Sequence, residues 1–277
     1  MKNMSKDKLI AYIIVALGGL IMLAPFYFMF IFSSQSNSGI LSVPPPIWFG
    51  EHLLDNLRVL VDFLPYFWHN LGLSLYIAVV VTVLNLLFCS LAGYAFAMFE
   101  FRFKNLMFIG IMATMLLPPF LGMIPTAMIM STIGWMNDPK ALIVPAACGA
   151  MGIFMMRQFI ASSIPKELVE AARMDGCGEF KIYYRVIVPL IKPAFGTLGL
   201  ITFIGSWNNF MGPLVVMNDM KMFTIPLALR ALQGTAGQVP WGAVSLGATI
   251  AVLPLLFLFI MASRRLIDGL TAGAVKG

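Results

Sequence analysis

The chain has 277 residues, of which 60% are hydrophobic and only 11% are charged, and its mean hydropathy is +0.91. A soluble domain averages about 45–50% apolar and about 25% charged residues, so a water-soluble fold of this length could not bury so much apolar surface. The composition indicates an integral membrane protein, in which the net charge of +6 reports orientation rather than nucleic-acid binding.

Apolar runs along the chain predict an all-α protein with six transmembrane helices. A helix needs about 20 apolar residues to cross a hydrocarbon core of about 30 Å. The predicted spans are residues 9–32, 71–99, 106–130, 141–159, 194–217 and 242–263. They leave an N-terminal segment (1–8), a transmembrane domain (9–263) and a C-terminal tail (264–277).

The basic residues predict which side of the membrane each loop occupies. Six spans place both termini on one side, and Lys and Arg gather in cytoplasmic loops. Only four of the 18 basic residues fall on the side opposite the termini, and they are Arg58, Lys140, Lys221 and Arg230. We therefore expect both termini to be cytoplasmic.

Asp, Glu, Lys, Arg and His are missing from the middle of all six predicted spans. Proton- or ion-driven transporters usually keep such a residue at membrane depth. The sequence also has no phosphate-binding loop, no H-E-x-x-H and no G-x-S-x-G motif, and its three cysteines and two histidines lack metal-ligand spacing. We expect no catalytic activity, metal or cofactor in this chain, which leaves a passive pore or a transport protein driven by a partner.

One segment departs from the apolar pattern. Residues 161–193, between the fourth and fifth spans on the cytoplasmic side, carry nine charged residues. Pro165 suits the start of a helix and Gly176 suits its end. A second short helix would place Phe180, Tyr183, Tyr184 and Ile187 on one face, because they repeat at i, i+3, i+4 and i+7.

This hairpin pattern alone leaves two interpretations open. An amphipathic hairpin often lies on lipid headgroups. Two helices joined by a glycine turn between two membrane spans would equally form a rigid lever for a partner protein.

Within the hairpin, "EAARMDG" followed by "VIVP" resembles the cytoplasmic signature of bacterial ABC-importer permeases. Val186 and Val188 stand where that signature usually has Ile and Leu. "FMMRQF", "GSWNNFMGPL" and the C-terminal "GLTAGAVKG" are similar to the carbohydrate branch, in particular the smaller permease of maltose-type importers. The similarity extends from about the second span to the last residue. The signature positions that match are Glu170, Ala171, Ala172, Gly176 and Pro189.

The resemblance implies a permease domain whose hairpin is a coupling helix, seated in a cleft of a cytoplasmic ATPase. Glu170 would pair with a basic residue of the ATPase, and Gly176 would make the turn. Residues 269–277 of the tail 264–277 would reach toward the ATPases, and the alternative is a solvated chain end. The implied coupling residues are Glu170, Ala171, Ala172, Met174, Asp175, Gly176 and Pro189.

The resemblance also implies a location and a set of partners. The chain would lie in a bacterial inner membrane as a heterodimer with a second permease. Two ATPase subunits would bind ATP and Mg, and an extracytoplasmic sugar-binding protein would dock on the outer loops 33–70 and 218–241. The implied function is ATP-driven carbohydrate import by alternating access. The alternatives are a secondary transporter or channel for a small polar solute, and an ABC permease for a solute other than a sugar.

Neutral polar residues within the spans are candidates for the solute path. Sugars are recognised by hydrogen bonds together with aromatic faces, which side chains near one tryptophan could supply. The alternative is that these residues form hydrogen bonds between helices, the commoner use of Ser and Asn in membranes. The candidates are Asn85, Ser206, Trp207, Asn208 and Asn209.

Overall fold

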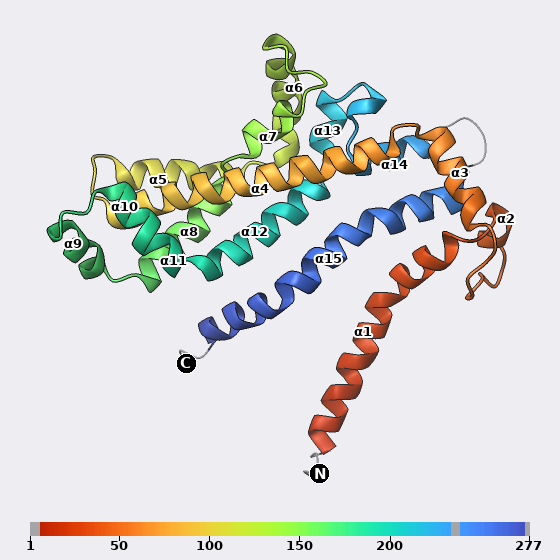
Figure 1. The fold of residues 1–277 in the computed structure, drawn as a ribbon, viewed down its shortest axis with the longest axis horizontal. Helices are drawn as coiled ribbons and strands as arrows, with labels where there is room; N and C mark the ends of the chain where they lie inside the picture. Colours follow the sequence, from red (N-terminus) through yellow and green to blue (C-terminus); the bar gives the residue numbers. More distant parts are fainter. Residues whose placement is uncertain (1–5, 234–238, 275–277) are drawn as a thin grey trace. The chain divides into compact units, whose positions relative to one another are not determined.

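The computed structural model describes residues 6–233 and 239–274, and every regular element in these residues is helical (Figure 1). The predicted all-α fold class is confirmed. Four helical segments are long and apolar enough to cross a membrane, and the number rises to six if each of two bent helix pairs is one span. The four are α1 (Lys6–Phe32), α4 (Phe67–Met98), α7 with α8 (Lys140–Ala146 and Ala150–Ser163) and α15 (Trp241–Ala274).

The shorter elements complete two compact units. One unit contains the chain up to residue 67 with residues 228–254, and the other contains residues 68–227 and the chain from residue 255 on. The shorter helices are α2 (Asn37–Ile40), α3 (Leu53–Phe63), α5 (Lys104–Ala113), α6 (Met123–Thr132), α9 (Lys166–Met174), α10 (Glu179–Ile182), α11 (Val188–Leu190), α12 (Lys192–Trp207), α13 (Met211–Val216) and α14 (Ile225–Leu232), with 3-10 turns η1 (Thr114–Leu116), η2 (Pro119–Gly122) and η4 (Met220–Met222) and a π-helical turn η3 (Tyr183–Ile187).

In the first unit, hydrogen bonds fold the predicted outer loop 33–70 back onto the end of α1. The backbone N–H of His52 donates to the Ser34 carbonyl at 2.9 Å. The Asn56 side-chain amide donates to the Ser33 carbonyl, also at 2.9 Å. Much of this loop is therefore ordered as α2 and α3.

In the second unit, α4 and α8 pack closely because glycines lie between them. A Cβ atom at Gly93 would lie 2.6 Å from the Cβ of Met156, and one at Gly152 would lie 2.6 Å from the Cys89 sulfur. No side chain fits at such distances, so the two helices approach as only small residues allow. Small residues serve the same purpose at many helix contacts in membranes, where van der Waals packing holds helices together.

A break between α7 and α8 is closed by side chains of α4. The Asn85 amide donates to the Ala146 carbonyl at 3.1 Å, and the Cys89 thiol lies 3.5 Å from the Gly149 carbonyl. An interrupted helix at membrane depth leaves backbone groups that lipid cannot satisfy, so neighbouring side chains must do so. This explains a polar Asn85 inside an apolar helix.

The predicted third span, residues 106–130, is bent rather than straight. The segment 104–116 meets the segment 120–132 at 93°. Pro118 and the proline that follows it lie at the bend. Proline lacks the N–H that a helix needs and disfavours helical backbone in the residue before it, so the helix cannot continue through this pair.

The predicted fifth span, residues 194–217, is corrected by the structure. Helix α12 ends at Trp207, and the separate helix α13 begins at Met211. The Asn209 side chain accepts a hydrogen bond from the Gly212 N–H at 3.1 Å. Asparagine competes for backbone hydrogen bonds in this way at helix ends, which favours a turn over a continuous helix.

Three predictions lie partly outside the described residues. The N-terminal segment 1–8 includes residues 1–5, the outer loop 218–241 includes residues 234–238, and the tail 264–277 includes residues 275–277, none of which the structure describes. The backbone of α15 is helical up to Ala274, past the predicted end of the sixth span.

Candidate functional site

The predicted cytoplasmic hairpin begins with α9, whose ends agree with the sequence signals. Pro165 stands directly before the helix, and Gly176 follows it with φ of +74°. The Gly176 N–H donates to the Arg173 carbonyl at 3.0 Å, which closes the last turn. Glycine adopts this left-handed backbone at low cost, so it is the residue expected just beyond a helix end.

We expect Gly176→Ala to loosen the hairpin. A left-handed backbone costs an L-residue about 1–2 kcal/mol. If this cost lowers the free energy of local opening by the same amount, amide hydrogen exchange in α9 of the purified protein should become about 5- to 30-fold faster. Gly178→Ala is the matched control, because Gly178 has φ of −70° and open space around it. Equal exchange in the two variants would contradict this account.

The hairpin is tied to α4 by a polar contact that sequence analysis missed. The Arg173 Nε donates to a Glu179 carboxylate oxygen at 2.7 Å, and the Tyr94 hydroxyl donates to the other oxygen at 2.7 Å. The guanidinium carbon of Arg173 also lies 5.2 Å from the ring centroid of Phe99. The hydrogen bond to Glu179 raises the pKa of Arg173. The sequence signal available for this contact was a basic residue, Arg173, and an acidic residue, Glu179, on either side of the glycine turn.

The predicted apolar face of the second hairpin helix is wrong. Tyr183 and Ile187 are buried, but Phe180 is 83% exposed and Tyr184 is 72% exposed. The chain forms the π-helical turn η3 from Tyr183 to Ile187. The buried face is rotated away from Phe180 and Tyr184 and carries Ile182 beside Tyr183 and Ile187.

The opposite face of the hairpin is open. Met174, the last residue of α9, is 88% exposed, which is unusual for a large apolar side chain. Ala172 is half-buried and packs against the core of this chain. The other predicted coupling residues are exposed, and they are Glu170, Ala171, Asp175, Gly176 and Pro189.

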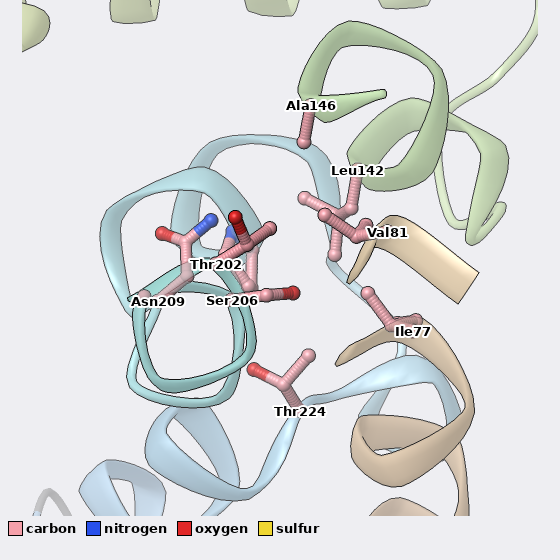
Figure 2. Close-up of a pocket in the computed structure, with 10 residues that line it drawn as sticks. Ile77, Val81, Leu142, Ala146, Thr202, Ser206, Asn209 and Thr224 are labelled. Atoms are coloured by element: carbon pink, nitrogen blue, oxygen red, sulfur yellow. The ribbon is translucent and has the colours of Figure 1, made fainter. Parts of the chain in front are cut away.

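A pocket of about 180 Å³ lies among α4, α7, α12, α13 and the segment before α14 (Figure 2). Figure 2 shows three of its polar side chains on the α12 side, Thr224 on the segment before α14, and apolar side chains of α4 and α7 across from α12. It is lined by Ile77, Val81, Leu142, Ala146, Thr202, Gly205, Ser206, Asn209, Pro213 and Thr224.

The structure brings two of the five candidate path residues to this pocket. Ser206 and Asn209 line it. Trp207 is 3% exposed and stacks on Phe203, with ring centroids 6.0 Å apart. The side chain of Asn85 is used in the α7–α8 break, so it acts there as a contact between helices.

Thr224 is the pocket residue that sequence analysis missed. It is 5% exposed, and its hydroxyl has no hydrogen-bond partner among the described residues. A buried polar group left without a partner costs about 1–3 kcal/mol. Thr224 lies outside the six predicted spans, so a search for polar residues within spans could not find it.

Comparison with known proteins identifies the family of this chain. A family model described as "Binding-protein-dependent transport system inner membrane component" matches residues 86–271. The chain belongs to this family. It is a permease component of a transport system and is not itself an enzyme.

Relatives match this permease over nearly its full length. It is 35% identical to the arabinooligosaccharides transport system permease protein AraQ of Halalkalibacterium halodurans, over 81% of this chain and 80% of the relative. It is 31% identical to the sn-glycerol-3-phosphate transport system permease protein UgpE of Brucella abortus (strain 2308), over 95% and 96%. A crystal structure of a bacterial ABC transporter involved in the import of the acidic polysaccharide alginate shares the fold, with a TM-score of 0.78 at 22% identity, over 95% of this chain and 99% of that one.

Proposed function

We propose that this permease imports a carbohydrate by alternating access, driven by ATP hydrolysis on a separate cytoplasmic ATPase. The observation that carries the proposal is the hairpin. Its outer face combines an exposed Met174 with the exposed carboxylate of Glu170. Glu179 accepts one hydrogen bond from Arg173 within the hairpin and one from Tyr94 of α4, which ties the hairpin to a membrane helix. A hairpin tied in this way, with an apolar and a charged side chain on its outer face, is suited to transmit force from a partner protein.

The proposed assembly is a heterodimer of this chain with a second permease, two ATPase subunits that bind ATP and Mg, and an extracytoplasmic sugar-binding protein. This chain would cross the bacterial inner membrane six times, with the bent segments 104–116 and 120–132 forming the third span, α12 forming most of the fifth, and both termini in the cytoplasm. Glu170, Ala171, Met174, Asp175, Gly176 and Pro189, with Ala172 behind them, would form the contact with the ATPase. The substrate path would include Ser206 and Asn209.

The choice of a carbohydrate rests on the relatives. AraQ is named for arabino-oligosaccharides and UgpE for sn-glycerol 3-phosphate, so the family includes both neutral sugars and a phosphorylated polyol. A secondary transporter is disfavoured because the middle of each predicted span has no titratable residue that could carry a coupling ion.

Purification with partners, followed by reconstitution, tests this function. The tagged chain is expected to co-purify from its host with a second permease and an ATPase that carries a phosphate-binding loop. Proteoliposomes of this complex should take up a labelled sugar only when ATP is enclosed on the ATPase side and the binding protein is on the other side. Uptake that proceeds equally without ATP would refute the proposal and support a channel or a secondary transporter.

A further inference from the structure

The pocket of Figure 2 contains the Thr224 hydroxyl, which has no hydrogen-bond partner among the described residues. The backbone beside it is held in place, because the Ile225 N–H donates to the Ser74 hydroxyl at 2.8 Å inside the protein. Since buried polar groups in native proteins nearly always have a partner, the missing partner of Thr224 is expected to enter the pocket.

The other polar groups of the pocket also have unused hydrogen-bonding capacity. The Ser206 hydroxyl forms no hydrogen bond to any residue that the structure describes, and neither does the Asn209 Nδ2 group. Among the described residues, the Thr202 hydroxyl donates only one long hydrogen bond, of 3.4 Å, to the side-chain oxygen Oδ1 of Asn85. These groups can both donate and accept hydrogen bonds, which is what recognition of a hydroxyl requires.

The charge and size of the pocket restrict its occupant further. None of its ten lining residues is acidic, basic or a histidine, so a phosphate or carboxylate would find no counter-ion from this chain. Ile77 and Val81 form an apolar wall that suits the C–H face of a sugar ring. A volume of about 180 Å³ is below the roughly 300 Å³ at which pockets for drug-sized ligands begin, so the pocket fits one small ring or polyol.

From these observations we propose that the pocket is a binding subsite for one unit of a neutral, polyhydroxylated solute, with Thr224, Ser206 and Asn209 bonding its hydroxyl groups. The proposal rests on the proposed transport function and narrows it to neutral saccharides or polyols, away from a phosphorylated solute such as the one for which UgpE is named. Trp207 takes no part, because it is stacked against Phe203 instead of lining the pocket.

Equilibrium binding separates this subsite from the transport function. The complete membrane complex is placed in lipid nanodiscs without the binding protein and titrated with labelled maltose, lactose and arabinobiose, and with labelled sn-glycerol 3-phosphate. At least one neutral sugar should bind. Thr224→Val keeps the shape but removes the hydroxyl, and it should weaken that binding about 3- to 10-fold, the loss expected for one neutral hydrogen bond.

Three variants keep the result interpretable. Thr224→Ser retains the hydroxyl and should bind like the wild type. Thr132→Val is the matched control, because the Thr132 hydroxyl is exposed and bonds to the Met128 carbonyl of its own helix. If Thr224→Val does not assemble, Ser206→Ala should weaken binding by the same range of about 3- to 10-fold.

Unchanged sugar affinity in Thr224→Val, or in Ser206→Ala if that variant is needed, would overturn the subsite. Binding of sn-glycerol 3-phosphate alone, or of none of the four solutes, would also overturn it. These results would leave the transport function intact if ATP-driven uptake still occurs. Failure of ATP-driven uptake with sugar binding retained would instead refute the transport function.

Discussion

Glu170→Arg should abolish ATP-driven uptake while leaving the permease folded. Glu170 is exposed on the outer face of α9, next to Ala171 and one turn before the exposed Met174. If a basic residue of the ATPase pairs with it, the reversal sets two like charges against each other in a contact that excludes water. Loss of one partner of such a pair costs about 2–5 kcal/mol, so coupled transport should fall at least ~30-fold.

The experiment compares uptake, ATP hydrolysis and subunit retention in the same preparation. ATPase subunits should separate from the Glu170→Arg permease on gel filtration, and uptake into proteoliposomes should be lost. Glu100→Arg is the control, because Glu100 is also exposed, lies outside the hairpin and the outer loops, and its reversal changes the net charge equally. Full uptake by Glu170→Arg would show that the hairpin does not dock through this carboxylate and would restore the interpretation as a lipid-surface element.

Local rules predicted the first half of the hairpin correctly. Proline before a helix and glycine after it act through the backbone of one or two residues, so Pro165 and Gly176 could be placed from the sequence alone. The second half failed because apolar spacing shows which residues share a face of a helix but not which part of that face meets the core. Ile182 and Ile187 are buried, whereas Phe180 and Tyr184 are exposed.

The interior of the membrane domain was harder to predict, because its polar residues act over long distances in sequence. In the sequence, Asn85 is a candidate path residue. In the structure it bonds the Ala146 carbonyl at the α7–α8 break, about 60 residues later in the chain. In the sequence, Thr224 is an ordinary loop residue. In the structure it lines a pocket together with residues of α12. Apolar periodicity indicates where a helix runs, but it contains no information about which helices meet. Only the structure could therefore show which side chain bonds to a helix break and which helices line a pocket together.

Gly93→Ala should open the contact between α4 and α8. The new methyl group would lie 2.6 Å from the Met156 Cβ and 2.8 Å from the backbone nitrogen of Arg157, and a backbone atom cannot turn aside as a flexible side chain can. Overpacking of this kind typically costs about 1–3 kcal/mol. Gly110→Ala in α5 is the matched control, because nothing lies within 4 Å of its new methyl group, and alanine gains about 1 kcal/mol over glycine in a helix.

Cys89 offers a direct measurement of this contact. Its thiol is fully buried and lies where a Cβ at Gly152 would be, so it is shielded only while α4 and α8 stay together. With Cys148 and Cys177 replaced by alanine, a maleimide dye should label Cys89 at a lower temperature in Gly93→Ala than in Gly110→Ala. The two variants are expected to differ by about 1–3 kcal/mol, because both gain the helix propensity of alanine and the overpacking penalty applies to Gly93→Ala alone. Identical labelling curves would mean that the helices separate freely at this point, and that glycine is not what allows their close approach.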